Sequence, residues 1–255
     1  MSNNKFKIFN GKEIYTHPMN DYISRLISIY QCWEPNITFF IDRNFNKSGV
    51  FFDIGGNLGY YSLAFSDKFK HVYCFEPNSK NTIIMKKSIE INEIKNISII
   101  ENPVAKSSNL FFSPVNKSGY EDSNLGVIQF VDTGNEGLRT VCLDDFIREN
   151  GIDFIDLMKV DIEGGEMDCL LGAKKSIDSN KIGSLIIEVT PKFSLEDSRK
   201  ILNFLSEKYE LYDLGLQEAG KLESATKLMF KISDIEAFLA KVKVQTNVFC
   251  RLRSK

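Results

Sequence analysis

From Val50 onward, short apolar segments alternate with segments that have the periodicity of a helix. Strands are predicted at 50–53, 71–76, 97–101, 155–160, 184–189, 209–213 and 246–252, and helices near 59–68, 79–93, 165–172 and 194–208. Because parallel strands need a long connection between them, usually a helix, this order predicts an α/β fold. We expect a doubly wound, mostly parallel, Rossmann-like sheet of seven strands.

Residues 1–48 lie outside this alternation and form an N-terminal extension. One face of a predicted helix within it is apolar and consists of Ile23, Leu26, Ile27 and Tyr30. A Trp33-Glu34-Pro35 break ends this helix, and a second apolar stretch follows at 37–45. We therefore expect a helical extension over 1–48 that packs on a domain spanning 49–255.

The interval at about 105–150 interrupts the alternation. Possible short strands at 110–113, 126–131 and 138–143 are joined there by polar turns. Two interpretations stay open: a surface elaboration, or an insert near the strand ends that contributes to ligand specificity.

The charge balance limits the classes of partner. With 32 Lys and Arg against 34 Asp and Glu, the net charge is −2, and no block of like charges stands out. A general nucleic-acid binder normally has a basic face, so no nucleic-acid partner is expected. The N-terminus lacks the apolar core of a signal peptide, and no apolar run approaches the length of a membrane span. We therefore expect a cytoplasmic protein without membrane insertion.

The cysteines and histidines limit the chemistry. The five cysteines are odd in number and well separated, which is typical of reduced core residues and not of disulfides or a zinc cluster. Since the chain has only His17 and His71, a histidine-based metal site or a Ser-His-Asp triad is nearly excluded.

Acidic residues end most of the predicted parallel strands. In an open α/β sheet, ligands bind outside the carboxyl ends of the strands, at the switch point. The residues at those ends are Asp53, Glu76, Asn102, Asp161 and Glu188. Four of these five are acids, which would repel phosphate but suit a ligand with hydroxyls and positive charge. S-adenosylmethionine fits that description, because it has a ribose diol, an ammonium group and a sulfonium centre.

The loop after the first strand does not reproduce the G-x-G-x-x-G pattern of a dinucleotide site. It has Asp53 followed by Gly55, Gly56 and Gly59. We expect Asp53 to orient the amino group of the methionine part, directly or through water. The glycines let the backbone approach the ligand, and Asn57 adds hydrogen bonds.

Further cofactor contacts are predicted after the second and third strands. Glu76 lies about twenty residues beyond the loop, the distance at which an acid accepts hydrogen bonds from ribose hydroxyls. Asn102 is placed to meet the adenine, with a plain turn residue as the alternative. Tyr60, Pro77 and Asn78 are assigned to the same cofactor site.

The segment LMKVDIEGGEMDCLLGA brings a second group of acids to the cleft. Its strand delivers Asp161 across the switch point from Asp53, so Asp161 is assigned to the cofactor site as well. Glu166 is interpreted as stabilising the start of a helix. Lys159 is expected to point away from the cleft, because side chains alternate along a strand.

Taken together, FFDIGGNLGYYS, VYCFEPN, LMKVDIEGGEMDCLLGA and SLIIEV closely resemble the FkbM-type class I methyltransferases. The resemblance covers roughly Val50 to Val189. The Trp33-Glu34-Pro35 break and TVCLDDFI also look like elements of that family. One departure is Gly56, where relatives more often carry alanine, and this change is expected to be mild. The resemblance implies a class I methyltransferase fold and methyl transfer from S-adenosylmethionine, which becomes S-adenosylhomocysteine. It also implies a hydroxyl acceptor, often on a sugar, glycan or natural product, without identifying it.

Methyl transfer to a weakly acidic hydroxyl needs in-line positioning and a base. By placement, the candidates for that base are Asp161, Glu163 and Glu188. His17 is an alternative because the extension can fold over the pocket, whereas His71 opens a strand at the wrong end of the sheet. A magnesium site is not expected, because Glu188 lacks the Asp-Asn pair that some O-methyltransferases use.

Other functions remain as alternatives. An NAD-dependent oxidoreductase or epimerase could use the same sheet, although the glycine spacing is wrong for it. A methyltransferase-like binding module without activity is a second alternative, since fold does not guarantee function. An N-methyltransferase is disfavoured because no Asn/Asp-Pro-Pro-Tyr motif follows the fourth strand, and the acidic charge balance disfavours an RNA methyltransferase. The sequence leaves the oligomeric state open.

Overall fold

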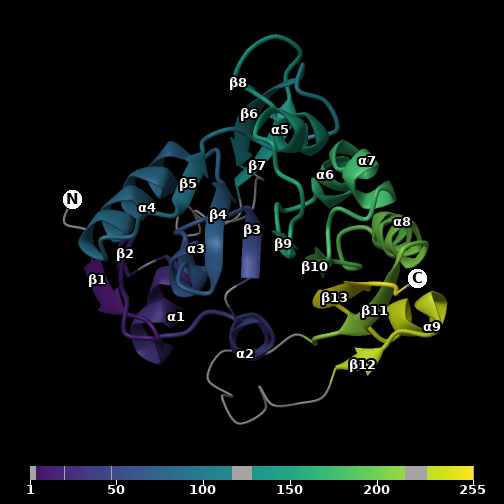
Figure 1. Cartoon of the computed structure of the whole chain (residues 1–255), viewed down its shortest axis with the longest axis horizontal. Helices are drawn as coiled ribbons and strands as arrows, with labels where there is room; N and C mark the ends of the chain where they lie inside the picture. The colour runs from purple at the N-terminus through teal and green to yellow at the C-terminus, as the bar shows by residue number, and fades with distance from the viewer. Residues whose placement is uncertain (1–3, 20, 47, 117–127, 216–228, 255) are drawn as a thin grey trace.

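A computed structural model describes residues 4–19, 21–46, 48–116, 128–215 and 229–254, and its centre is an eight-stranded sheet (Figure 1). In spatial order the strands are β12 (Phe230–Lys231), β11 (Tyr209–Asp213), β13 (Thr246–Leu252), β10 (Ser184–Val189), β9 (Leu157–Val160), β3 (Ser48–Ile54), β4 (Phe69–Phe75) and β5 (Ile97–Ile100). The five strands from β10 to β5 run parallel, and β13 is antiparallel to both β10 and β11. The predicted mostly parallel α/β sheet is confirmed.

The sheet has one strand more than the predicted seven, because β12 pairs with β11 at the edge. This strand has only two residues, Phe230 and Lys231. A segment of that length leaves no alternating pattern in the sequence, so it could not be predicted from periodicity.

The alternation of side chains along the strands divides the core into two hydrophobic clusters, one on each face of the sheet. Phe52 and Met158 belong to one cluster, and their neighbours Phe51 and Leu157 belong to the other. The first face is covered by α5 (Leu143–Glu149), α6 (Glu166–Gly172), α7 (Lys174–Asp178), α8 (Leu195–Ser206) and α9 (Ile235–Leu239). The second face is covered by α1 (Tyr22–Tyr30), α2 (Pro35–Asn44), α3 (Tyr60–Phe65) and α4 (Ser79–Ile91).

The N-terminal extension contains a hairpin as well as helices, so the expectation of a purely helical extension is wrong. β1 (Asn4–Lys7) and β2 (Glu13–Thr16) pair as antiparallel strands. Ile8 and Ile14 are fully buried and join the second cluster. The break between the two helices is confirmed, because α1 ends at Tyr30 and α2 begins at Pro35.

The interval at 105–150 forms a small antiparallel sheet followed by α5. Its strands are β6 (Phe111–Asn116), β7 (Ile128–Asp132) and β8 (Leu138–Arg139), in the order β7-β6-β8. The strand predicted at 138–143 covers only 138–139, since α5 already begins at Leu143. Residues 126 and 127 of another predicted strand lie outside the described residues.

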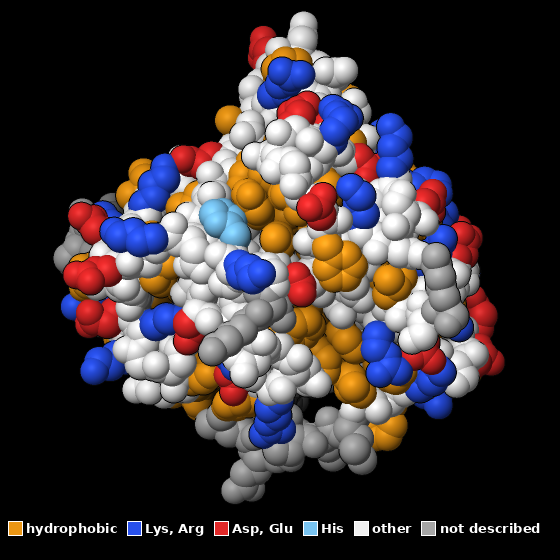
Figure 2. Space-filling view, in the orientation of Figure 1, with side chains coloured by type: hydrophobic (Ala, Val, Ile, Leu, Met, Phe, Trp, Pro, Cys, Tyr) orange, Lys and Arg blue, Asp and Glu red, His pale blue; other side chains and the backbone are white. Residues whose placement is uncertain are grey.

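The mixed charge of the surface and the burial of the cysteines agree with the expectations from the composition. On the face seen in Figure 2, hydrophobic side chains gather over the central strands, and charged side chains of both signs are interspersed around them. All five cysteines are free and buried, as expected for reduced core residues. Within the described ranges, no helix has both the length and the apolar character needed to cross a bilayer.

The loop between β3 and α3 requires glycine at two positions. Gly55 (φ +86°) and Gly59 (φ +79°) have left-handed backbone conformations that other residues rarely adopt. A Cβ on Gly55 would lie 1.8 Å from the backbone oxygen of Asp161, and one on Gly59 would lie 2.5 Å from Cγ of Met85. The loop can therefore pass close to the end of β9 because Gly55 has no side chain, and it can pack against Met85 of α4 because Gly59 has none.

Gly56 is also sterically restricted, and the expectation that an alanine would be mild here is wrong. A Cβ at this position would lie 2.1 Å from Sγ of Cys74, which is fully buried in β4. An alanine at position 56 and Cys74 therefore do not fit together in this packing.

We predict that Gly56→Ala lowers the free energy of unfolding by about 1–3 kcal/mol through overpacking. The double variant Gly56→Ala/Cys74→Ala should be more stable than Gly56→Ala, because it removes the clashing sulfur atom. Urea denaturation of both variants and of Cys74→Ala measures this coupling. Simple additivity of the two single effects would contradict the predicted clash.

Candidate active site

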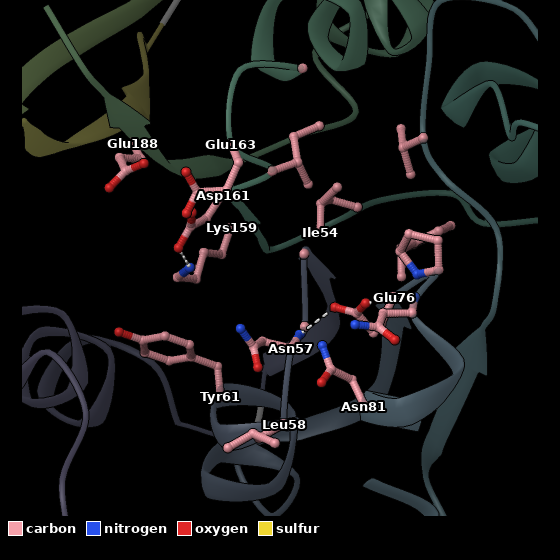
Figure 3. A pocket seen from close by; sticks show the side chains of 18 of the residues that line it. Ile54, Asn57, Leu58, Tyr61, Glu76, Asn81, Lys159, Asp161, Glu163 and Glu188 are labelled. Atoms are coloured by element: carbon pink, nitrogen blue, oxygen red, sulfur yellow. Dashed lines mark hydrogen bonds and ion pairs between the residues drawn. The ribbon is translucent and has the colours of Figure 1, made fainter. Parts of the chain in front are cut away.

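A cavity of about 350 Å³ lies at the carboxyl ends of the parallel strands (Figure 3). Among the residues that line it are eleven of those predicted for the site: Gly55, Gly56, Asn57, Tyr60, Glu76, Pro77, Asn78, Asn102, Asp161, Glu163 and Glu188. The structure thus brings together side chains that the sequence separates by more than a hundred residues. Two predicted residues, Asp53 and Gly59, do not line the cavity.

Asp53 lies beneath the loop and not on the cavity wall. Its side chain is 1% exposed, and its Oδ2 accepts hydrogen bonds from the backbone N (3.1 Å) and Oγ (2.6 Å) of Ser62. Burial raises the pKa of this carboxyl group, which the charge of Lys159 opposes. The predicted direct contact between Asp53 and a ligand is therefore corrected: the carboxylate holds the start of α3. Gly59 likewise acts through its backbone, as the N-cap of α3.

Glu76 follows β4 and is held rigidly at one end of the cavity. Its Oε2 accepts from the backbone N of Asn57 (2.7 Å), and its Oε1 accepts from the backbone N of Asn78 (2.8 Å). Burial raises its pKa to about 7, although these hydrogen bonds oppose the shift. Each carboxylate oxygen has further acceptor capacity, so Glu76 can receive hydrogen bonds from ligand hydroxyls.

Lys159 points into the cavity, so the expectation that it points away is wrong. Residues two apart on a strand share a face, and Lys159 therefore lies on the same side as Asp161. Its Nζ donates to Oδ2 of Asp161 at 2.8 Å and lies 4.7 Å from the ring centroid of Tyr61. Burial disfavours the charge of Lys159, but Asp161, Glu34 and Asp53 together raise its pKa.

Glu34 was not predicted as a site residue, yet it lines the cavity. It sits in the break between α1 and α2 with φ 39°. It accepts hydrogen bonds from the hydroxyl of Tyr61 (2.8 Å) and from Nδ2 of Asn247 on β13 (3.0 Å). Burial raises its pKa. The Trp33-Glu34-Pro35 motif was the sequence signal that could have identified it.

Glu188 lies near the end of β10, where several carboxyl groups meet. Gln245 donates from Nε2 to its Oε1 at 2.8 Å. Burial and then the negative charges of Asp161 and Glu163 raise the pKa of Glu188 to about 10. The unliganded site therefore disfavours the charged form of this carboxyl group.

Glu166 has the structural role expected for it. It is the first residue of α6, and its carboxylate accepts from the backbone N of Ile162 (3.1 Å) and of Gly164 (3.0 Å). These bonds stabilise the turn that carries Glu163 into the cavity.

Asn102 also lines the cavity and donates from Nδ2 to the backbone oxygen of Arg139 at 2.9 Å.

Several further lining residues were not predicted, and most of them come from the extension, the small sheet or positions far along the chain. They are Tyr22, Trp33, Tyr61, Asn81, Phe112, Phe193 and Gln245. Neither histidine lines the cavity. In the part of the chain that the structure describes, no three His, Cys, Asp or Glu residues are grouped as a metal site would require.

We predict that Glu188→Gln stabilises the unliganded protein, increasingly so at high pH. A carboxyl group whose pKa is raised in the folded state destabilises that state as the pH rises from about 4.5 to about 10. Glutamine keeps an acceptor for the hydrogen bond from Gln245 and removes this pH-dependent destabilisation. The melting temperature of the variant should be close to that of wild type at pH 5 and several degrees higher at pH 9. Each kcal/mol in the free energy of unfolding shifts the melting temperature by about 2–4 °C. Thermal unfolding over this pH range measures the difference.

The matched control is Glu207→Gln, because Glu207 is exposed at the end of α8. It should leave the pH dependence of the melting temperature unchanged. If the melting temperature of Glu188→Gln changed with pH in the same way as that of wild type, the raised pKa of Glu188 would be contradicted.

Comparisons with known proteins identify the family of the chain. Residues 53–214 match the family model described as the methyltransferase FkbM domain. No curated protein sequence gives a significant match. The similar solved structures include a putative methyltransferase from Streptococcus mutans in complex with SAH, at 13% identity and a TM-score of 0.48, covering 85% of this chain and 96% of that chain.

Two other similar structures are a precorrin-6y C5,15-methyltransferase from Geobacter metallireducens and an rRNA methylase from Streptococcus thermophilus. The first has 12% identity and a TM-score of 0.46, covering 85% of this chain and 87% of that chain. The second has 11% identity and a TM-score of 0.48, covering 86% of this chain and 95% of that chain. The assignment rests on the family model, which spans more than half of the chain. The chain therefore belongs to the FkbM methyltransferase family and is a methyltransferase whose methyl donor is S-adenosylmethionine.

Proposed function

We propose that this protein transfers the methyl group of S-adenosylmethionine to a hydroxyl oxygen of a sugar, glycan or other hydroxylated natural product. The observation that carries this proposal is the distribution of acids along one cavity. Glu76 is fixed by two backbone N–H groups at one end, and Asp161, Glu163 and Glu188 line the wall beside it. This arrangement suits a ligand that has a diol at one end and a cationic centre in its middle.

The cofactor assignments follow from this distribution. Glu76 accepts from the ribose hydroxyls, and the backbone at Gly55 to Asn57 lies beside the methionine part. Asn102 lies on the side of the adenine. A cavity of about 350 Å³ is within the range of about 300–1,000 Å³ for small-molecule sites.

The remaining wall supports an acceptor with both apolar and hydroxyl-bearing surfaces. Tyr22, Trp33 and Phe193 contribute aromatic rings, and Gln245 and Glu188 contribute hydrogen-bonding groups. Aromatic ring faces contact C–H groups favourably, as the face of a sugar ring requires. The carboxyl group of Glu188 can form a hydrogen bond with an acceptor hydroxyl.

The protein's part in the reaction is positioning and proton transfer. When bound, S-adenosylmethionine supplies a methyl group on a good leaving group, so no covalent catalysis is needed. As the acceptor oxygen bonds to the methyl carbon, its proton passes to a carboxylate, and the electron pair of the broken S–C bond stays on sulfur. Asp161 is our first candidate for the proton acceptor, and Lys159 holds it in place.

Cofactor binding and acceptor class can be tested directly. S-adenosylhomocysteine should raise the melting temperature, whereas NAD should not. Activated sugars, glycolipids and small hydroxylated metabolites are then screened as acceptors with labelled S-adenosylmethionine. At least one of them should gain a labelled methyl group on oxygen. Structured RNA and amines form the competing arms of this screen. Labelling of only those arms would overturn the proposed acceptor class, and stabilisation by NAD instead would overturn the cofactor.

We predict that Asp161→Asn lowers turnover by about 10²–10⁴ while its affinity for S-adenosylmethionine stays within a few-fold of wild type. Glu163→Gln and Glu188→Gln are the next candidates and serve as comparison variants. Calorimetry and single-turnover kinetics on all three separate binding from chemistry. If affinity falls together with turnover in Asp161→Asn, Asp161 binds the ammonium group instead. Near-normal turnover in all three variants would exclude these acids as the base.

A further inference from the structure

His17 is buried outside the cavity and forms one specific hydrogen bond. It directly follows β2 and is 7% exposed. Its Nε2 lies 2.8 Å from Oδ1 of Asn81. Because an amide oxygen can only accept, Nε2 of His17 is the donor. Because His17 does not line the cavity, the structure argues against it as the base.

Asn81 connects His17 to the cofactor end of the cavity. It lies in the first turn of α4, is 2% exposed and lines the cavity. Figure 3 places the amide of Asn81 next to the carboxylate of Glu76, and Asn81 lowers the pKa of that group. The amide of Asn81 therefore accepts from His17 with its oxygen and faces Glu76 with its NH₂ group.

The N-terminal hairpin fixes the position of His17. The backbone N of Tyr15 donates to Oγ of Ser88 at 2.9 Å. The side chain of Asn92 accepts from the backbone N of Glu13 (2.9 Å) and donates to its oxygen (2.6 Å). Asn81, Ser88 and Asn92 lie on one face of α4, because their spacing of seven and four residues matches whole turns of the helix. The extension is thus attached along α4 in one register.

We propose that His17 is a positioning residue for cofactor recognition, which holds the Asn81 amide with its NH₂ group toward Glu76. Without the donor of His17, the amide of Asn81 can rotate and present its oxygen to the carboxylate. Glu76 then faces a like partial charge, so its geometry for the ribose hydroxyls is no longer fixed. This inference rests on the proposed role of Glu76 in cofactor binding.

The experiment compares His17→Met with His17→Gln, because both side chains fill a similar space and only glutamine can donate to Asn81. The dissociation constant of S-adenosylhomocysteine is measured by calorimetry. His17→Met should weaken binding about ten-fold, because the Asn81 amide can then turn its oxygen toward Glu76. His17→Gln should stay within about three-fold of wild type. His71→Met is the matched control, since His71 contacts Ser98 and does not line the cavity.

The same variants in a Glu76→Ala background separate positioning from a general structural effect. If His17 acts through Glu76, His17→Met should cause no further loss of affinity there. An equal loss in both backgrounds, or wild-type affinity of His17→Met, would overturn the inference. Failure of wild type to bind S-adenosylhomocysteine would instead overturn the proposed function. If His17→Met does not fold, Asn81→Leu in both backgrounds gives the same test.

Discussion

The close contact between the β3–α3 loop and the end of β9 is the constraint on which the site depends. The missing side chain of Gly55 lets the loop approach the backbone oxygen of Asp161, and the backbone N of Asp161 donates to the oxygen of Ile54 at 3.0 Å. Both Gly55 and Gly56 donate to the oxygen of Phe75. Backbone hydrogen bonds therefore tie together the ends of β3, β4 and β9. They fix the two acids, Glu76 and Asp161, in one cavity.

The electrostatics of this cavity are unfavourable without a ligand. Glu34, Asp161, Glu163 and Glu188 line it together with one buried cation, Lys159. Burial and then the neighbouring acids raise the pKa of Glu188, because both disfavour its charged form. A cationic ligand relieves that repulsion, so the site is organised for binding at some cost to stability.

The extension is part of the binding site and not an appendage. Tyr22, Trp33 and Glu34 form one part of the wall, and Glu34 links the extension to α3 and β13 through its two hydrogen bonds. The hairpin is attached to α4, the helix that begins beside Glu76. A boundary at residue 48 therefore marks a change in the sequence pattern without separating two functional units.

Local patterns in the sequence determined the fold class and the acids at the strand ends. Strand and helix periodicities are properties of short segments, and the carboxyl ends of parallel strands converge whatever their loops do. Glu76, Asp161 and Glu188 could be placed on the cavity for that reason.

Contacts between distant segments were decided only by the tertiary structure. Asp53 accepts hydrogen bonds from Ser62. Lys159 forms an ion pair with Asp161 and lies close to the ring of Tyr61. Gly56 packs against Cys74. Glu34 and His17 reach the site through partners that lie more than sixty residues away. Each of these contacts depends on how elements pack against one another, and the periodicity of a single segment carries no information about its partner.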